Sequence, residues 1–517
     1  RHPSPPSHIV GRGRGKWERG KGWLTNHMQS LPLISVLLFL PAVSAGVLLF
    51  FPAERKRAIR LFALATATIA LLLSAVAYFS YDQAAGGYQL QEYVPWIPRW
   101  GIGFHVGVNG ISLPLVLLTG IVMFTGVLIS WGIDDRPREF FAFLFILATG
   151  VFGVFVSLDL FLLFFFYEIA VFPMYLLISM WGWPKTREYA AMKLTLYLFF
   201  GSMVALVGAL VLVFASGTLT FDLPALEAAG FPADLQRIVV PFVFMGFAVL
   251  GGLFPFHNWS PDGHVAAPTA VSMFHAGVLM KLGAFAALRV GIMLMPEGAK
   301  FYMPFIIILA LINVLYGAFI AMVQTDFKYV IGFSSVSHMG LVMLGFATLN
   351  YDGMLGASLQ MFSHGVMTAL FFAVVGMVYD RTHTRDISSL GGMGRKMPLA
   401  AVAFIVGGLA SMGMPGFSGF IAEFPIFLGL WQTRPVVAVA AAVGIIVTAA
   451  YILVVFRRVF FGPIPEEFDR TVTGINRKDK AALLFLMLFL IGMGVYPNFI
   501  APLVQTGVQP ILKILGV

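Results

Sequence analysis

Three ionisable side chains stand inside long apolar runs of this 517-residue chain. Glu168 lies in LFLLFFFYEIAVFPMYLLI, Lys281 in HAGVLMKLGAFAAL and Glu423 in FSGFIAEFPIFL. A charge near the centre of a lipid bilayer costs about 2.5–3.5 kcal/mol on insertion scales, so residues of this kind are functional candidates by default. The spacing and surroundings of these three residues therefore indicate chemistry inside a membrane.

Three further candidates lie in neighbouring apolar runs. Lys193, in REYAAMKLTLYLFF, stands near a helix start, where its ammonium could reach the membrane surface, so a structural role is equally open. His338 and His364 lie in successive runs, and a single buried histidine is more often a core residue than part of a relay. Because Glu, Lys and His exchange protons when burial and neighbours shift their pKa values, the group as a whole favours proton transfer.

Other kinds of site find little support in the sequence. The chain has no cysteine, which excludes a disulfide, a Cys-ligated iron–sulfur cluster and a thiol nucleophile. His257 and His264 lie in or beside a loop without the paired spacing of metal ligands. Residues 391–396 (GGMGRK) form a Gly-rich loop that does not follow a strand, so it does not predict a phosphate cradle. We expect the chain to bind no cofactor or metal.

The composition identifies the environment of these residues. The chain is 59% hydrophobic and 11% charged, with a mean hydropathy of +0.89. Soluble domains are about 25% charged, so a soluble enzyme, a disordered protein and a nucleic-acid binder are excluded despite a pI near 9.6. The apolar runs are continuous and about 20 residues long, which predicts an all-α polytopic protein in the lipid bilayer.

Apolar runs between charged or Pro/Gly breaks predict about 14 transmembrane helices. One boundary, at Leu158-Asp159, requires a long apolar stretch to turn back on itself. The expected spans are 31–51, 59–81, 111–132, 140–157, 160–181, 194–215, 239–256, 268–292, 303–324, 328–348, 354–378, 398–430 (interrupted), 436–456 and 481–500.

The loops divide the positive charges unequally. The side that includes residues 52–58 carries 19 Lys and Arg, whereas the other side, counted from Met28, carries six. Cytoplasmic loops hold the Lys/Arg excess, so both termini are expected on the extracytoplasmic side. Residues 1–27 add six more positive charges to that side. We interpret them as a non-native extension before a start at Met28, the alternative being a disordered basic tail.

Two spans are interrupted in the same way. The seventh contains GGLFPFHNW with Pro255, and the twelfth contains SMGMPGFSGF with Pro415, 160 positions later. A proline kink is common in membrane helices, but broken segments at matching positions of two halves indicate an internal repeat and an ion path. We expect inverted five-helix repeats formed by spans 4–8 and 9–13. The chain is then expected to divide into four segments: N-terminal helices 1–3 (28–139), the first repeat (140–292), the second repeat (303–456), and a loop with the last helix (457–517).

These residues, taken together, resemble the antiporter-like membrane subunits of respiratory complex I, which are related to Mrp antiporters. The similarity covers about half of the chain, and HTRD followed by GGM, with a short tail after the last span, is most similar to the M-type chains of bacteria. The stretches that carry it are YEIAVFPMYLLISMWG (167–182), FPFHNWSPDGHVAAPTAVS (254–272), AGVLMKLGAFAALR (276–289), YGAFIAMVQTDFKYVIGFSSVSHMG (316–340), SHGVMTALFF (363–372), RTHTRDISSLGGM (381–393) and LASMGMPGFSGFIAEFPI (409–426).

The resemblance implies roles for the buried residues. Glu168 matches a glutamate that pairs with a lysine on span seven, Lys281 matches the central proton carrier, and Glu423 matches the residue that releases the proton outward. His338 and His364 match polar positions on the hydrated axis between them.

One position departs from the pattern of the family. The span-seven lysine is expected five residues before Pro255, where this chain has Leu250. We predict that Lys193 or His275 partly replaces it. His275 and Lys281 are six residues apart, about 240° of turn and roughly 9 Å of rise on a regular helix, so a direct transfer between them needs water or another helix.

The resemblance implies a proton-translocating subunit of an NADH:quinone oxidoreductase in the bacterial inner membrane. NADH, FMN, iron–sulfur clusters and quinone would bind to partner subunits, and the neighbours would be L-like and N-like antiporter chains and small membrane subunits. An Mrp-type Na⁺/H⁺ antiporter subunit or a membrane-hydrogenase subunit is the alternative. A structural spacer that has lost transport is a third interpretation, which the three costly buried charges oppose.

Overall fold

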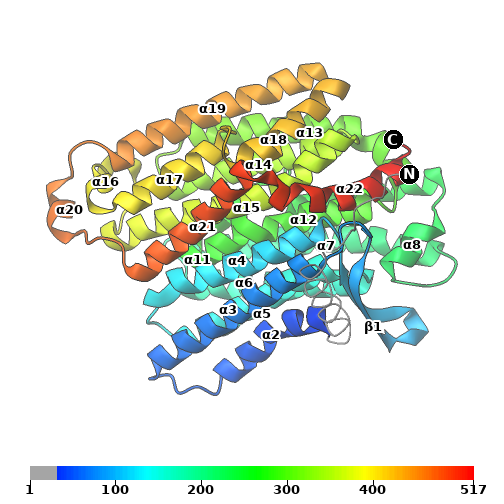
Figure 1. Cartoon of the computed structure of the whole chain (residues 1–517), viewed down its shortest axis with the longest axis horizontal. Helices are drawn as coiled ribbons and strands as arrows, with labels where there is room; N and C mark the ends of the chain where they lie inside the picture. Colours follow the sequence, from blue (N-terminus) through cyan, green and yellow to red (C-terminus); the bar gives the residue numbers. More distant parts are fainter. Residues whose placement is uncertain (1–31) are drawn as a thin grey trace, which may run out of the picture.

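The computed structural model describes residues 32–517, so the interpretation of residues 1–27 lies outside the described part. Long helices run side by side between two ends of the molecule (Figure 1). We call one end the hairpin end, because it holds the strands β1 and β2, helix α8 (Leu223–Ala229) and the C-terminus. The opposite end, which holds α16 (Met393–Lys396) and α20 (Glu466–Thr471), is called the loop end.

The predicted class, a helical protein with many membrane spans, is confirmed. Among the described residues, 11 helices are long and apolar enough to cross a membrane. Helices α2 and α17 are apolar but shorter, and α21 begins with the charged residues of RKDK. The helices of at least 14 residues in the described part are α2 (Leu33–Leu48), α3 (Lys56–Ser80), α4 (Ser112–Ile129), α5 (Pro137–Val156), α6 (Leu160–Trp181), α7 (Arg187–Ala215), α9 (Ala233–Leu250), α13 (Pro296–Val323), α14 (Phe327–Ala347), α15 (Tyr351–Thr382), α17 (Pro398–Ser411), α18 (Ser418–Thr433), α19 (Pro435–Phe460), α21 (Arg477–Val495) and α22 (Ala501–Leu515).

Span eight of the sequence analysis is a composite helix at the centre of the bundle. It consists of α11 (Thr269–Phe274), a π-helical turn (His275–Leu279), α12 (Met280–Ala286) and a second π-helical segment (Ala287–Ile292). All residues of its apolar window are buried inside the molecule. A π-bulge inside a helix frequently marks a functional site, because it widens the turn and redirects the side chains.

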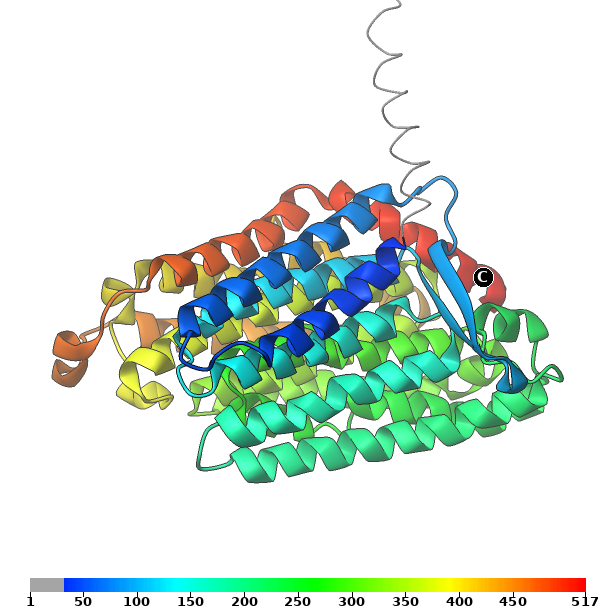
Figure 2. The ribbon, with the colours of Figure 1, turned by 90° about the horizontal axis from the view of Figure 1, so that it is seen from below.

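The loop at residues 82–110 contains a β-hairpin that the sequence analysis did not predict. Strands β1 (Gln89–Ile97) and β2 (Ile102–Val108) pair antiparallel. The carboxylate of Glu92 accepts the backbone N–H of Ile34 at 2.8 Å and that of Ser35 at 3.1 Å. These two bonds satisfy free donors in the first turn of α2. The hairpin therefore ties the first described helix to the end of the bundle where the C-terminus also lies (Figure 2).

Both breaks predicted from Gly and Pro are present and have the same backbone geometry. Helices α9 and α17 each end in a Schellman motif, with Gly252 (φ +73°) and Gly413 (φ +63°) in the left-handed conformation. In each motif the residue after this glycine donates its N–H five residues back, Leu253 to Ala248 and Met414 to Leu409, both at 3.0 Å. Helices α10 (Trp259–Ala266) and α18 then continue the two interrupted spans.

A second feature also occurs once in each half. The residue that caps α6 pairs with the loop after α7, and the residue that caps α14 pairs with the loop after α15, through bridges Asp159–Asp222 and Asp326–Asp386. Chain connectivity places the first bridge at the hairpin end and the second at the loop end. The same kind of connection therefore occurs at both ends of the bundle, and the inverted five-helix repeats stay a prediction.

The side-chain carboxyl groups of two of these residues, Asp159 and Asp386, have different surroundings. Burial raises the pKa of Asp159, whose carboxylate accepts the N–H of Leu162 at 3.1 Å and caps α6. Hydroxyl donors Ser388 and Ser389 lower the pKa of Asp386. The cap at Asp159 confirms the expected turn between two apolar spans.

Candidate functional site

Lys281 stands on the composite helix and is 0% exposed. Its Nζ lies 2.8 Å from Nδ1 of His364 on α15 and also donates to the carbonyl of Ala276. Helical side chains lean toward the N-terminus of their helix. The ammonium is therefore carried back along its own helix to the level of the π-helical turn.

The row of polar groups continues from His364 into the second half of the chain. The imidazole rings of His364 and His338 are 5.3 Å apart, and Nδ1 of His338 lies 3.1 Å from Oε1 of Glu423. Gln360 donates to the same carboxylate oxygen at 2.8 Å, and Nε2 of His338 lies 2.9 Å from the hydroxyl of Ser411. Four predicted residues (Lys281, His364, His338 and Glu423) thus form one buried row, which we call the central row.

Glu168 lies apart from the central row. Its carboxylate accepts a hydrogen bond from Ser202 of α7 at 2.6 Å. The side chain is half-buried, and Phe165 and Phe172 on the same helix face are exposed. Glu168 therefore faces the lateral surface of the bundle near its middle.

The two cations proposed to replace the missing lysine have other neighbours. Lys193 forms an ion pair with Asp262 of α10 at 2.7 Å, and Tyr329 donates to the other oxygen of that carboxylate at 2.9 Å. His275 packs against the ring of His264 at 3.9 Å and stacks on Trp259 at 5.1 Å. Neither residue bonds to Glu168 in the structure, and the proposed replacement stays a prediction.

Several groups of the site were not identified from the sequence. Gln360, Ser411 and Ser202 are uncharged polar residues in apolar helices, a weak signal that applies equally to many structural hydroxyls. Asp262 and His264 belong to the quoted segment FPFHNWSPDGH, whose loop-like Gly/Pro content made it read as a connection. The part from Trp259 onward belongs to helix α10, in which His264 is 0% exposed.

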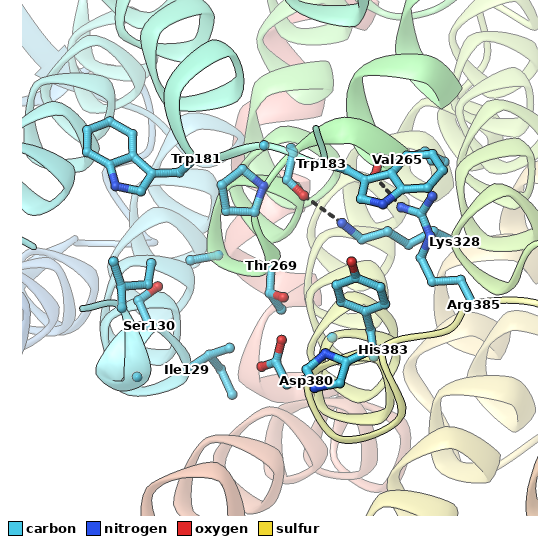
Figure 3. Close-up of a pocket in the computed structure, with 18 of the residues that line it drawn as sticks. Ile129, Ser130, Trp181, Trp183, Val265, Thr269, Lys328, Asp380, His383 and Arg385 are labelled. Carbon is cyan, nitrogen blue, oxygen red and sulfur yellow. Dashed lines mark hydrogen bonds between the residues drawn. The ribbon is translucent and has the colours of Figure 1, made fainter. Parts of the chain in front are cut away.

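A cavity of about 520 Å³ opens at the loop end (Figure 3). Lys328 of α14 lies on its wall, where its Nζ donates to the Ala267 carbonyl at 2.6 Å and to Ser272 at 3.1 Å. Arg385 lies beside it, with its guanidinium 3.9 Å from the ring of Trp183 and bonded to the Val265 carbonyl at 2.8 Å. The cavity thus combines a polar, cationic wall with the C-terminal end of α10.

Among the described residues, no group of three His, Asp or Glu side chains is placed to hold a metal ion. The central row can instead move protons. Imidazole accepts a proton on one nitrogen and releases one from the other, and amine and carboxylate groups stand at the two ends of the row. The row lies between apolar helices, where the effective dielectric constant is low. The electrostatic energy of each charged group therefore depends strongly on the charge of the group beside it.

Comparisons with known proteins agree with this geometry. Residues 157–448 match the family model described as "NADH:quinone oxidoreductase/Mrp antiporter, TM". A relative from Synechocystis, NAD(P)H-quinone oxidoreductase chain 4-2, is 35% identical, with 93% of this chain and 90% of the relative covered. The chain 4 2 relative from Thermosynechococcus vestitus is 36% identical, with 90% and 89% covered.

Solved structures show the same fold. A chain of respiratory complex I from Thermus thermophilus with bound NADH matches with a TM-score of 0.87 and 28% identity, covering 94% of this chain and all of that chain. A chain of the Mrp complex from Dietzia matches with a TM-score of 0.82 and 20% identity, again over 94% and 100%, which shows the fold alone. The chain belongs to the NADH:quinone oxidoreductase/Mrp antiporter membrane family and is a homologue of its chain 4 members.

Proposed function

We propose that this chain is a proton-translocating membrane subunit of a complex I-type quinone oxidoreductase. The observation that carries the proposal is the central row, in which an amine, two imidazoles and a carboxylate follow one another inside an apolar bundle. Ionisable groups are costly to place inside a membrane, so a bundle that holds four of them in a row indicates a transport path. The chain 4 homology supports a role beside quinone-reducing subunits.

The row works as a series of linked proton sites. A proton on Lys281 can pass to Nδ1 of His364 across 2.8 Å, and the approach of His338 to Glu423 across 3.1 Å provides the last site before release. Each transfer changes the charge felt by the next group. Moving one charge through the full membrane potential requires about 2.3 kcal/mol per 100 mV, a scale that several small pKa changes can supply together.

The half-buried position of Glu168 at the lateral surface is an argument that other membrane subunits pack against this chain. A carboxylate facing lipid near the centre of a bilayer would be costly, so a neighbouring chain is expected to cover it. We infer that L-like and N-like antiporter chains and small membrane subunits flank this one. NADH, FMN, iron–sulfur clusters and quinone belong to partners, and this chain contributes proton movement to their translocase activity.

We place the assembly in a bacterial cell membrane with both termini on the extracytoplasmic side. The described start of α2 and the C-terminus lie together at the hairpin end, and the Lys/Arg-rich loops lie at the loop end. The charge asymmetry supports a cytoplasmic loop end.

The test is the number of protons moved per electron by the purified complex in sealed vesicles. Replacing Lys281 with Met, or Glu423 with Gln, is expected to lower this ratio, because each variant removes a proton site from the row. Lys300→Met is the control, since Lys300 is an exposed lysine paired with Glu297 at the hairpin end. An unchanged ratio in both row variants overturns the proposal, and uptake of labelled Na⁺ instead of H⁺ would favour the antiporter alternative.

A further inference from the structure

Three buried histidines outside the central row, His257, His264 and His275, have ring nitrogens without hydrogen-bond partners among the described residues, and His264 and His275 lie against each other. Both nitrogens of His275 and Nδ1 of His264 are in this state, and both side chains are 0% exposed. Nε2 of His264 lies 3.0 Å from the hydroxyl of Ser260. Buried polar groups are nearly always paired in native proteins, so a cluster of unpaired ones requires a reason.

The chain makes room for this pair. The rings are 3.9 Å apart, and Trp259 stacks on His275 from the other side. At Gly263 an added Cβ would lie only 2.8 Å from Cε1 of His275, so the glycine leaves the space that this ring occupies. Two imidazoles are thus held face to face between α10 and the π-helical turn.

On one side the pair adjoins the central row. Lys281 stands six residues after His275, but its ammonium bonds to the carbonyl of Ala276, the residue next to His275. On a regular helix His275 and Lys281 would point to different faces. Because the Lys281 side chain folds back toward Ala276, its ammonium nevertheless lies close to His275. The amine lies at the level of His275 and contacts His364 as well.

On the other side, the residues that follow His264 in the chain line the loop-end cavity. Val265 and Ala267, which follow His264 in the chain, line the cavity together with Lys328 (Figure 3). Lys328 donates to Ser272 at 3.1 Å, and Ser272 donates to the carbonyl of His264 at 2.8 Å. A polar path therefore leads from the cavity to the segment that carries His264, and a bridging water can complete the step to Nδ1.

We propose that the His264–His275 pair carries protons from the loop-end cavity to Lys281. The pair takes the place of the connection that a lysine at position 250 would make, where this chain has Leu250. The inference rests on the proposed function of the central row. In one transfer Nδ1 of His264 gains a proton from the cavity through a bridging water, the pair gives one proton to neutral Lys281, and the histidines return to their initial charge.

The first experiment measures protons moved per electron by the complex in sealed vesicles. His275→Leu is expected to lower the ratio as much as Lys281→Met does, and His275→Gln, which keeps a polar side chain that cannot carry the proton, is expected to do the same. Adding Leu250→Lys to His275→Leu is expected to restore at least half of the lost ratio. Lys328→Met is expected to slow pumping, with Lys396→Met as its control, because Lys396 also lies at the loop end but pairs with Asp469.

The outcomes separate the two proposals. An unchanged ratio in Lys281→Met overturns the proposed function itself. A lowered ratio in Lys281→Met together with an unchanged ratio in His275→Leu and His275→Gln overturns only the His264–His275 path. Assembly of each variant is checked by the amount of intact complex, and the rescue by Leu250→Lys distinguishes lost proton transfer from misfolding.

The second experiment tests access to the cavity. The chain has no cysteine, so Thr269→Cys, on the cavity wall, gives this chain a single thiol. A membrane-impermeant maleimide is expected to label it in intact vesicles only from the side of the loop end, as judged by the mass of this chain. Thr119→Cys, buried inside α4 and bonded to its own helix, is the unlabelled control. Absence of labelling at position 269 from that side contradicts the path.

Discussion

At the scale of single residues, Lys193 and Glu168 differ in how their charged groups are paired. Lys193 is held by Asp262 at 2.7 Å, and Asp262 also accepts the hydroxyl of Tyr329 at 2.9 Å. Glu168, in contrast, is bonded to the neutral hydroxyl of Ser202. The pairing of Lys193 with Asp262 links α7 to α10 and leaves Glu168 available to a neighbouring chain.

A double-mutant cycle distinguishes these pairings. We expect Lys193→Ala and Asp262→Ala to be non-additive by about 0.5–3 kcal/mol, because the residues are in direct contact. Lys193→Ala and Glu168→Ala should be additive to within about 0.5 kcal/mol. The measurement is thermal unfolding of the four proteins of each cycle in detergent. Strong non-additivity between Lys193 and Glu168 would show that the lysine serves Glu168 after all.

Gln360 positions the carboxylate at the end of the central row. Its amide donates to Oε1 of Glu423 at 2.8 Å and lies 3.4 Å from Nδ1 of His338. Gln360→Leu removes this donor, so we expect a reduced rate of proton pumping, because the carboxylate loses a contact that holds it beside His338. Gln360→Asn, which keeps an amide on a shorter side chain, is expected to retain part of the rate. A pumping rate equal to that of the unaltered protein in both variants would limit Gln360 to packing.

The sequence identifies charged members of the site more readily than neutral ones. Lys281 and Glu423 were predictable, because a charged side chain inside an apolar membrane helix is energetically costly and therefore indicates a function. Gln360 and Ser411 were not, because only the positions of four different helices show that they meet His338 and Glu423. The pairing of Lys193 with Asp262 was not predictable for the same reason: periodicity reports a helix face, whereas pairing depends on tertiary packing.

At the scale of elements, the broken helices depend on groups from outside themselves. Asn313 of α13 is 0% exposed and makes three hydrogen bonds, two of them to the backbone of the first break and one to α14. Its Oδ1 accepts the N–H of Phe254 at 3.0 Å, and its Nδ2 donates to the carbonyls of Gly252 at 3.0 Å and Val336 at 2.9 Å. Inside a bilayer, irregular backbone is tolerated only where other protein groups satisfy it.

Asn313→Leu is therefore expected to be strongly destabilising. The variant leaves buried backbone groups at the break unpaired, each costing about 1–3 kcal/mol. We expect a lower midpoint of thermal unfolding in detergent and a reduced yield of assembled complex. Thr125→Val is the matched control, because the hydroxyl of Thr125 bonds only to carbonyls of its own helix α4. An Asn313→Leu protein as stable as this control would show that the break does not need the clamp.

Elements were predictable where a strong local signal marks them. The continuous apolar runs predicted a bundle of membrane-spanning helices, and the Gly/Pro pairs located both breaks, which follow the ends of α9 and α17. The hairpin at β1 and β2 was missed, because its first strand contains Pro95 and presents no clean alternation of apolar and polar residues. Asn313 was missed as well, since a single polar residue in an apolar helix does not reveal what it supports.

At the scale of the whole molecule, the basic charge is a signal of orientation. The hairpin end and the loop end are separated by the full length of the bundle, and the loop side carries 19 Lys and Arg. Because cytoplasmic loops hold such an excess, we predict that the loop end faces the cytoplasm. The entry cavity would then open to the cytoplasm, in agreement with outward proton movement along the central row.

Single cysteines test this orientation directly, because the chain has none of its own. Thr473→Cys is exposed at the loop end, and Ala84→Cys is exposed in the loop before the hairpin. In intact cells, an impermeant maleimide is expected to label position 84 and to spare position 473, whereas inside-out vesicles should show the reverse. Each protein serves as the control for the other. Labelling of position 473 in intact cells would show that the loop end faces outward. The loop-end cavity would then supply protons to Lys281 from the outside of the cell.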